Sequence, residues 1–137
     1  MTNPIRESFD RARQAGFAER FYSRLLDADP AIRARFSKTD FQRQRELLTH
    51  AIYSMLDYAE GKAMGKMALE RLAKLHEPTR LDIPPYMYDH WLRCFLATLG
   101  EADSQMNDEL LASWRDALRP GIRLMTSTYT LSKSRVR

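Results

Sequence analysis

This chain of 137 residues has a single cysteine, no long apolar run and no block of like charges. With only Cys94, no internal disulfide can form, and this suits a reducing compartment. The sequence has neither a signal-like apolar start nor a segment long enough to span a membrane, so we expect a cytoplasmic protein. Cys94 falls in the apolar stretch 91–99, where we interpret it as a small buried core residue and not as a nucleophile.

The charges are balanced and scattered. Twenty-two Lys and Arg are interspersed with eighteen Asp and Glu, which gives a formal net charge of +4. This pattern favours a solvated surface over a nucleic-acid-binding face. Only the end of the chain is locally basic, with Lys133, Arg135 and Arg137. We expect residues 133–137 to form a short disordered tail without a function of its own, and residues 1–132 to form one domain.

Apolar residues recur with helical spacing in the first half of the chain, and no convincing strand appears. Gly16 ends a first helix, and a second stops near Pro30, which opens a short turn of helix ending at about residue 36. Thr39 and Gln42 resemble a capping box and are expected to begin a longer helix, which Gly61 stops.

Three further helices are expected in the second half. One is rich in leucine and ends at His76, just before Pro78; another runs from residue 84 until Gly100 terminates it. The last begins at about residue 104, with Pro120 and Gly121 inside it, where we expect a kink or a local break. The sequence therefore predicts an all-α domain of about six to seven helices.

Four residues add chemistry to this helical pattern. His76 closes its leucine-rich helix, where an imidazole is well placed to hold iron. Gln44 lies thirty-two positions earlier, Phe36 eight before Gln44, and Tyr22 fourteen before Phe36. This order of two aromatics, an amide and a histidine is what a haem pocket needs. The alternatives are plain core packing for Phe36, a core or surface position without a ligand for His76, and a solvated surface position for Gln44.

Longer motifs carry a resemblance to a known family. The segment FYSRLLDADPAIRARF, the QRELL and LAKLH motifs, Tyr86 and Trp114 follow one another with suitable spacing. In these features the chain resembles a bacterial single-domain globin, and is similar to the globin part of flavohaemoglobins over nearly its whole length. The resemblance implies a globin fold that encloses haem b, iron protoporphyrin IX.

The resemblance also implies residue roles. His76 would be the proximal iron ligand, with its second ring nitrogen bonded to a backbone carbonyl near Leu72. Tyr22 and Gln44 would donate hydrogen bonds to a ligand on the distal side, and Leu48 would act there as a steric gate. The expected haem-binding residues are therefore Phe36, Leu48, Leu72 and Tyr86, the distal residues Tyr22 and Gln44, and the metal ligand His76.

Two other histidines and one tyrosine require separate interpretation. His50 lies about 240° round an ideal helix from Gln44, so we expect it to face away from the pocket. His90 is expected to be half-exposed on another helix. Tyr129 falls where flavohaemoglobins carry a glutamate near the proximal side. A neutral phenol there makes peroxidase-like activation less supported than reversible ligand binding.

The resemblance leaves three functional hypotheses. We favour reversible, haem-based binding of dioxygen or another small gaseous ligand, for transport, storage or sensing. The second is detoxification by a nitric oxide dioxygenase reaction, for which we expect a separate reductase, since these 137 residues do not include the reductase domain of flavohaemoglobins. The third is a haemless globin-like regulatory module. We expect neither a nucleic-acid nor a membrane partner.

Overall fold

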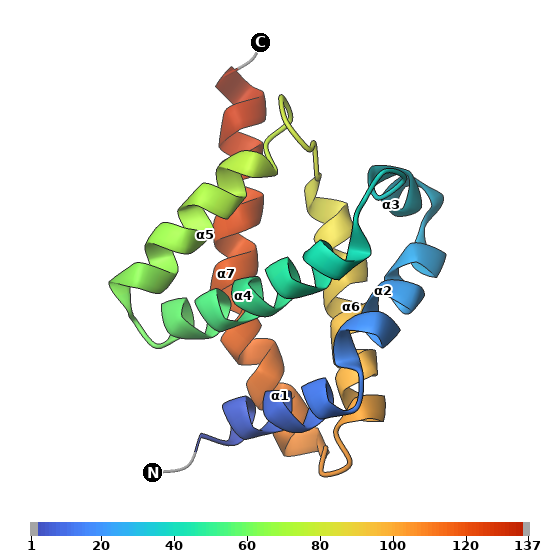
Figure 1. The fold of residues 1–137 in the computed structure, drawn as a ribbon. Coiled ribbons are helices and arrows are strands. Elements are labelled where there is room, and N and C mark those ends of the chain that lie inside the picture. Colours follow the sequence, from blue (N-terminus) through green and yellow to red (C-terminus); the bar gives the residue numbers. More distant parts are fainter. Residues whose placement is uncertain (1–2, 136–137) are drawn as a thin grey trace.

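The computed structural model describes residues 3–135, which form seven α-helices (Figure 1). No strand occurs in this part of the chain, and the prediction of an all-α fold is confirmed. The helices are α1 (Pro4–Gln14), α2 (Phe17–Ala28), α3 (Pro30–Arg35), α4 (Phe41–Ala59), α5 (Ala63–Leu75), α6 (Pro85–Ala102) and α7 (Asp108–Arg135).

Helices α4 and α5 meet at the turn that joins them, diverge from it, and both pack against α7 (Figure 1). A glycine makes their close approach possible. A Cβ atom on Gly65 would lie 2.6 Å from the backbone nitrogen of Tyr58 and 2.8 Å from the carbonyl oxygen of Ser54. Only a residue without a side chain fits here, so Gly65 brings the first turn of α5 into direct contact with the last turn of α4.

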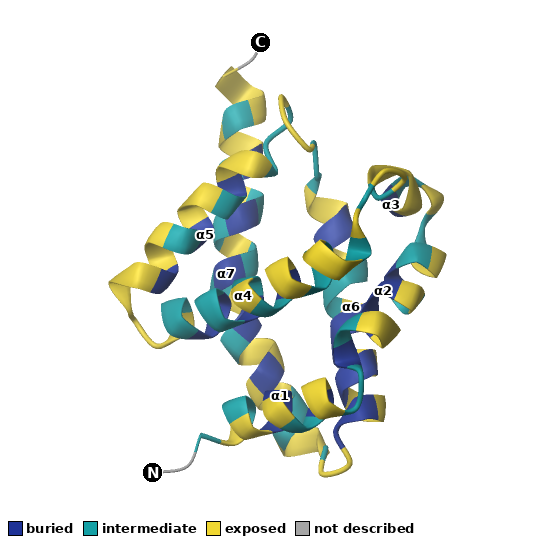
Figure 2. Ribbon diagram, in the orientation of Figure 1, coloured by how far each residue is buried: buried dark blue, intermediate teal, exposed yellow. Residues whose placement is uncertain are grey.

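Aromatic side chains form the centre of the core, where α1, α2, α6 and α7 meet. Trp114 is fully buried and lies 5.9 Å from Phe9 and 5.5 Å from Phe95, measured between ring centroids. Phe95 in turn contacts Phe17 at 4.8 Å. Figure 2 shows the corresponding burial along α6 and α7, in contrast to the exposed outer side of α5. Burial of large aromatic surface is the main stabilising contribution here.

A chain of buried polar groups crosses this core. Trp114 Nε1 donates to Ser8 Oγ at 3.0 Å, and Ser8 Oγ donates to Asp103 Oδ2 at 2.6 Å. Arg11 donates to both carboxylate oxygens of Asp103, at 2.6 and 3.0 Å. Burial disfavours the charged form of Asp103, but the hydrogen bonds from Arg11, Ser8 and a backbone N–H outweigh it and lower the carboxyl pKa to about 2. The network ties α1 to the turn between α6 and α7.

Two helix boundaries differ from the sequence-based expectation. The residue that caps α4 is Asp40 and not Thr39, because the Asp40 carboxylate accepts hydrogen bonds from the backbone N–H groups of Gln42 and Arg43 at 3.1 and 3.4 Å. The expectation that Gly100 ends α6 was also wrong. Gly100 keeps a negative φ, and the helix continues to Ala102 before an extended residue stops it.

Helix α7 also differs from expectation. It begins at Asp108, four residues later than expected, and runs unbroken through Pro120 and Gly121. A Cβ on Gly121 would lie 3.0 Å from the Met55 side chain, so the glycine serves close packing of α7 on α4. Residues 133–135 belong to α7, Arg137 lies outside the described residues, and the domain boundary expected at residue 132 stays a prediction. No described helix has the length and apolar character to cross a membrane.

Candidate functional site

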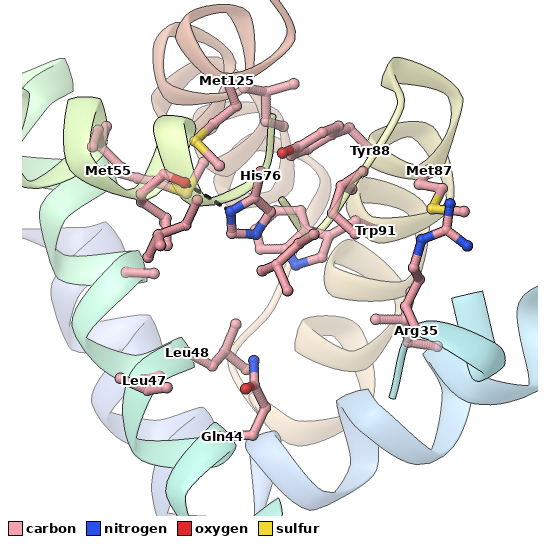
Figure 3. Close-up of a pocket in the computed structure, with 18 of the residues that line it drawn as sticks. Arg35, Gln44, Leu47, Leu48, Met55, His76, Met87, Tyr88, Trp91 and Met125 are labelled. Atoms are coloured by element: carbon pink, nitrogen blue, oxygen red, sulfur yellow. Dashed lines mark hydrogen bonds between the residues drawn. The ribbon is translucent and has the colours of Figure 1, made fainter. Parts of the chain in front are cut away.

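A largely apolar cavity of about 470 Å³ lies between α4, α5 and α6, with further walls from α2, α3 and α7. Its volume is in the range typical of small-molecule and cofactor sites. Figure 3 shows His76 directed into the cavity from one side, with Gln44 and Leu48 on the opposite side. Of the expected site residues, it is lined by Tyr22, Phe36, Gln44, Leu48, Leu72 and His76.

His76 is the C-cap of α5, and its ring is held by the preceding turn of the helix. The Nδ1 atom lies 2.7 Å from the carbonyl oxygen of Leu72, the contact expected from the sequence. Because a carbonyl oxygen can only accept, Nδ1 is the donor, and in the neutral ring the lone pair is on Nε2. Burial lowers the pKa of His76 and outweighs the opposing effect of the Leu72 contact. A neutral imidazole is the form that binds a metal.

The segment after His76 folds back onto the end of α5. The backbone N–H of Ile83 donates to the carbonyl oxygen of His76 at 3.1 Å, and that of Leu81 donates to Leu75 at the same distance. Asp82 has a φ of 56° and is the one non-glycine residue with positive φ in the described part of the chain. Several hydrogen bonds therefore hold the backbone around His76 in place.

Tyr22 and Gln44 lie together on the far side of the cavity. Gln44 Nε2 donates to the Tyr22 hydroxyl oxygen at 3.1 Å. The Tyr22 proton is then free to be donated to a ligand in the cavity. Burial raises the pKa of Tyr22 to about 12, although the Gln44 hydrogen bond acts in the opposite direction. Tyr22 is therefore a neutral donor throughout the physiological pH range.

Phe36 and Leu48 complete the distal wall. Phe36 caps α3 and packs edge-on against the Tyr22 ring, with 5.7 Å between ring centroids. Leu48 is buried on α4, one turn beyond Gln44. Both side chains line the cavity together with Tyr22.

Comparison with known proteins agrees with this geometry. A family model described as Globin matches residues 19–122. The chain belongs to the globin family. A crystal structure from Pseudomonas aeruginosa PAO1, described as structurally highly homologous to a human haemoglobin, is 35% identical in sequence and superposes with a TM-score of 0.87. The match covers 92% of this chain and 95% of that one. Comparison with curated proteins gave no match.

Membership of the globin family implies a haem cofactor and the binding of a small ligand. The site of this globin fits haem. Residues 3–135 contain no group of three or more His, Cys, Asp or Glu that would hold a bare metal ion. The iron of haem is already held by the porphyrin nitrogens, however, so a single histidine is sufficient as its protein ligand. The apolar cavity in front of His76 and its neutral imidazole agree with such a group.

One expected residue, Tyr86, lies outside the cavity of the globin. Its side chain is 46% exposed and packs against the ring of His90. Tyr88, which the sequence analysis did not identify, lines the cavity instead. Its hydroxyl is the one buried side-chain polar atom without a hydrogen-bond partner among the described residues. Because α6 begins at Pro85, Tyr88 and Trp91 share a face by their spacing of three, while Tyr86 lies about 200° from Tyr88.

Three further residues clarify the edges of the site. Tyr129 does not reach the cavity, and its hydroxyl donates to Asp82 Oδ1 at 2.7 Å. His50 was expected to face away but lines the cavity. The lining face of α4 is wide enough to include Leu47 and Ser54, and His50 is next to them at its margin. His90 is half-buried, and its Nε2 lies 3.6 Å from Asp29 Oδ2.

Proposed function

We propose that this globin binds haem b through His76 and uses it for reversible binding of dioxygen or another small gaseous ligand. The observation that carries the proposal is that His76 and Gln44 lie on opposite sides of one apolar cavity (Figure 3), with the Tyr22 hydroxyl hydrogen-bonded to Gln44. Haem supplies an iron atom that coordinates small gaseous ligands. We place the protein in a reducing cytoplasm, since Cys94 is its single cysteine.

The proposed role of each side chain follows from its contacts. His76 offers Nε2 to the iron, because Nδ1 is engaged by the Leu72 carbonyl. Tyr22 donates its hydroxyl proton to a ligand that carries partial negative charge, while Gln44 holds the Tyr22 oxygen in position. Leu48 and the other apolar side chains exclude water, which strengthens the hydrogen bond to the ligand.

Ligand spectroscopy tests this proposal. The wild-type protein, expressed with haem supply, is expected to show a Soret band that shifts between ferric, dithionite-reduced and carbon monoxide-bound forms. His76→Gly should lose or alter these spectra and regain them with added imidazole, because free imidazole can replace the missing side chain. His90→Ala is the matched control, since His90 lies outside the cavity. A colourless wild-type protein that takes up no haemin would favour a haemless regulatory module.

Enzymatic nitric oxide removal is the competing hypothesis. The same donors would assist it, with electrons from a separate reductase. Tyr129 is bonded to Asp82 and offers no carboxylate to the His76 side, which favours reversible binding. Oxygenated protein mixed with nitric oxide and a reductase distinguishes the two. Sustained nitrate formation over many turnovers would support the enzyme, whereas a single turnover without reductive recycling would support the carrier or sensor.

A further inference from the structure

The mouth of the cavity contains an arginine that the proposed function does not yet use. We propose that Arg35 binds a carboxylate group of the haem and thereby slows haem loss. This inference rests on the proposed haem binding and concerns the porphyrin side chains, not the iron. It assigns a site for a carboxylate at the α3 end of the cavity.

The charges around the cavity support such a site. Among the described residues that line it, Arg35 is the one with a permanent charge, and no Asp or Glu lines it. The remainder is mostly apolar, with a few neutral polar groups. The Arg35 side chain is 32% exposed, which places it at the boundary between cavity and solvent. A porphyrin with ionised carboxylates needs this arrangement, an apolar interior with a cation at the rim.

The hydrogen bonds of Arg35 leave its terminal nitrogens available. Arg35 Nε donates to the backbone carbonyl oxygen of Asp82 at 3.0 Å. The Nη2 atom lies 3.6 Å from Asp82 Oδ2, which is an ion-pair contact but too long for a hydrogen bond. The guanidinium is thus anchored through Nε, while its Nη donors can reach an incoming carboxylate. Arginine is suited to this role because its planar fork matches the two oxygens of a carboxylate.

Tyr129 contacts the second carboxylate oxygen of Asp82, the one that does not face Arg35. Its hydroxyl donates to Asp82 Oδ1 at 2.7 Å, so α7 keeps the carboxylate at ion-pair distance from Arg35, where it does not occupy the Nη donors with a hydrogen bond. The Asp82 backbone is fixed by a hydrogen bond from its N–H to the Glu77 carbonyl oxygen at 3.0 Å. Its unusual φ of 56° is maintained by these contacts. Asp82 and Tyr129 are therefore positioning residues, and Arg35 is the binding residue.

The first test compares haem-loss rates with and without the porphyrin carboxylates. Holoprotein is mixed with an excess of apomyoglobin as haem acceptor, using wild type and Arg35→Gln. Arg33→Gln is the matched control, since Arg33 lies on the same short helix and pairs with Asp27, outside the cavity. Each protein is loaded either with haem or with haem dimethyl ester, whose carboxylates cannot ionise.

Arg35→Gln is expected to release haem about tenfold faster than wild type, while Arg33→Gln stays within about twofold of it. With the dimethyl ester, the difference between Arg35→Gln and wild type should shrink to about twofold or less, since no carboxylate remains to be bound. Equal release of haem by all three proteins would overturn the proposal. So would an undiminished effect of Arg35→Gln on the ester. Failure of haem binding itself is a separate result, because wild type would then show no Soret band.

Tyr129→Phe tests the positioning role. Without the Tyr129 hydroxyl, Asp82 is free to close its 3.6 Å ion-pair contact with Arg35 to a hydrogen bond and so to compete with the haem carboxylate. We expect faster loss of haem, by about threefold, but an unchanged rate for the dimethyl ester. A merely structural effect of the substitution would speed the loss of both compounds alike and would contradict this role.

Discussion

Gln44 Nε2 donates a hydrogen bond to the Tyr22 hydroxyl oxygen at 3.1 Å. Gln44 therefore acts on a ligand through Tyr22, because it holds the Tyr22 hydroxyl that faces the ligand. Their contributions to ligand binding should accordingly be coupled and not additive.

Substitution of the distal pair tests this coupling. We expect Tyr22→Phe to speed oxygen dissociation by about tenfold, because the donor to the ligand is lost. Gln44→Leu should have a smaller effect, of about threefold, since it only frees the Tyr22 hydroxyl to rotate. The double variant should resemble Tyr22→Phe. Stopped-flow measurement of oxygen dissociation from the four proteins gives the result, and multiplication of the two single effects would show that each residue bonds the ligand independently.

The sequence pointed to two residues that line opposite sides of the cavity, while their roles stay predictions. His76 and Gln44 could be identified because each lies at the end or start of a clear helical pattern, and the Leu72 contact follows from the geometry of one helical turn. Residues on the cavity side of α6 could not be identified in the same way. Tyr86 and Tyr88 are two positions apart, and which one faces inward depends on how α6 is rotated against its neighbours.

The contacts of Arg35, Asp82 and Tyr129 at the mouth of the cavity could not be predicted from the sequence for a different reason. Arg35 meets Asp82, forty-seven positions away, and Asp82 meets Tyr129 after a further forty-seven. Such contacts arise from tertiary packing and leave no periodic signal. The position of His50 at the edge of the cavity likewise could not be predicted. It depends on how much of the α4 surface the cavity covers, which a helical wheel of α4 alone does not show.

The close approach of α4 and α5 makes a prediction about stability. Gly65→Ala would place a methyl group within 3 Å of backbone atoms of α4, so the helices must separate. We expect a loss of about 2 kcal/mol in the free energy of unfolding. Gly100→Ala is the matched control, because nothing lies within 4 Å of its added Cβ and it sits inside a helix. That substitution should stabilise the protein by about 0.5 kcal/mol. Denaturant unfolding of both variants measures the difference.

The buried carboxylate Asp103 makes the stability depend on pH. Its pKa is about 2 in the folded protein, below the ordinary value of 3.8, so the stabilisation is complete above about pH 5 and is lost as pH falls towards 2. Asp103→Asn should lower the free energy of unfolding by about 2 kcal/mol at pH 7. The difference from wild type should narrow by pH 3. Asp116→Asn, at an exposed position, should show neither effect. A constant difference across this pH range would contradict the role given to the Asp103 charge.

Removal of the unpaired Tyr88 hydroxyl is expected to stabilise the protein, in contrast to the loss of stability expected for Asp103→Asn. This group is buried without a hydrogen-bond partner among the described residues, so Tyr88→Phe should raise the free energy of unfolding of the apoprotein by about 1 kcal/mol. Tyr129→Phe is the control, since its hydroxyl is bonded to Asp82 and its removal should lower the same quantity by about 1 kcal/mol. Urea unfolding of the two apoproteins compares them. A loss of stability in both would mean that the Tyr88 hydroxyl finds a partner in solution, such as a water molecule in the cavity.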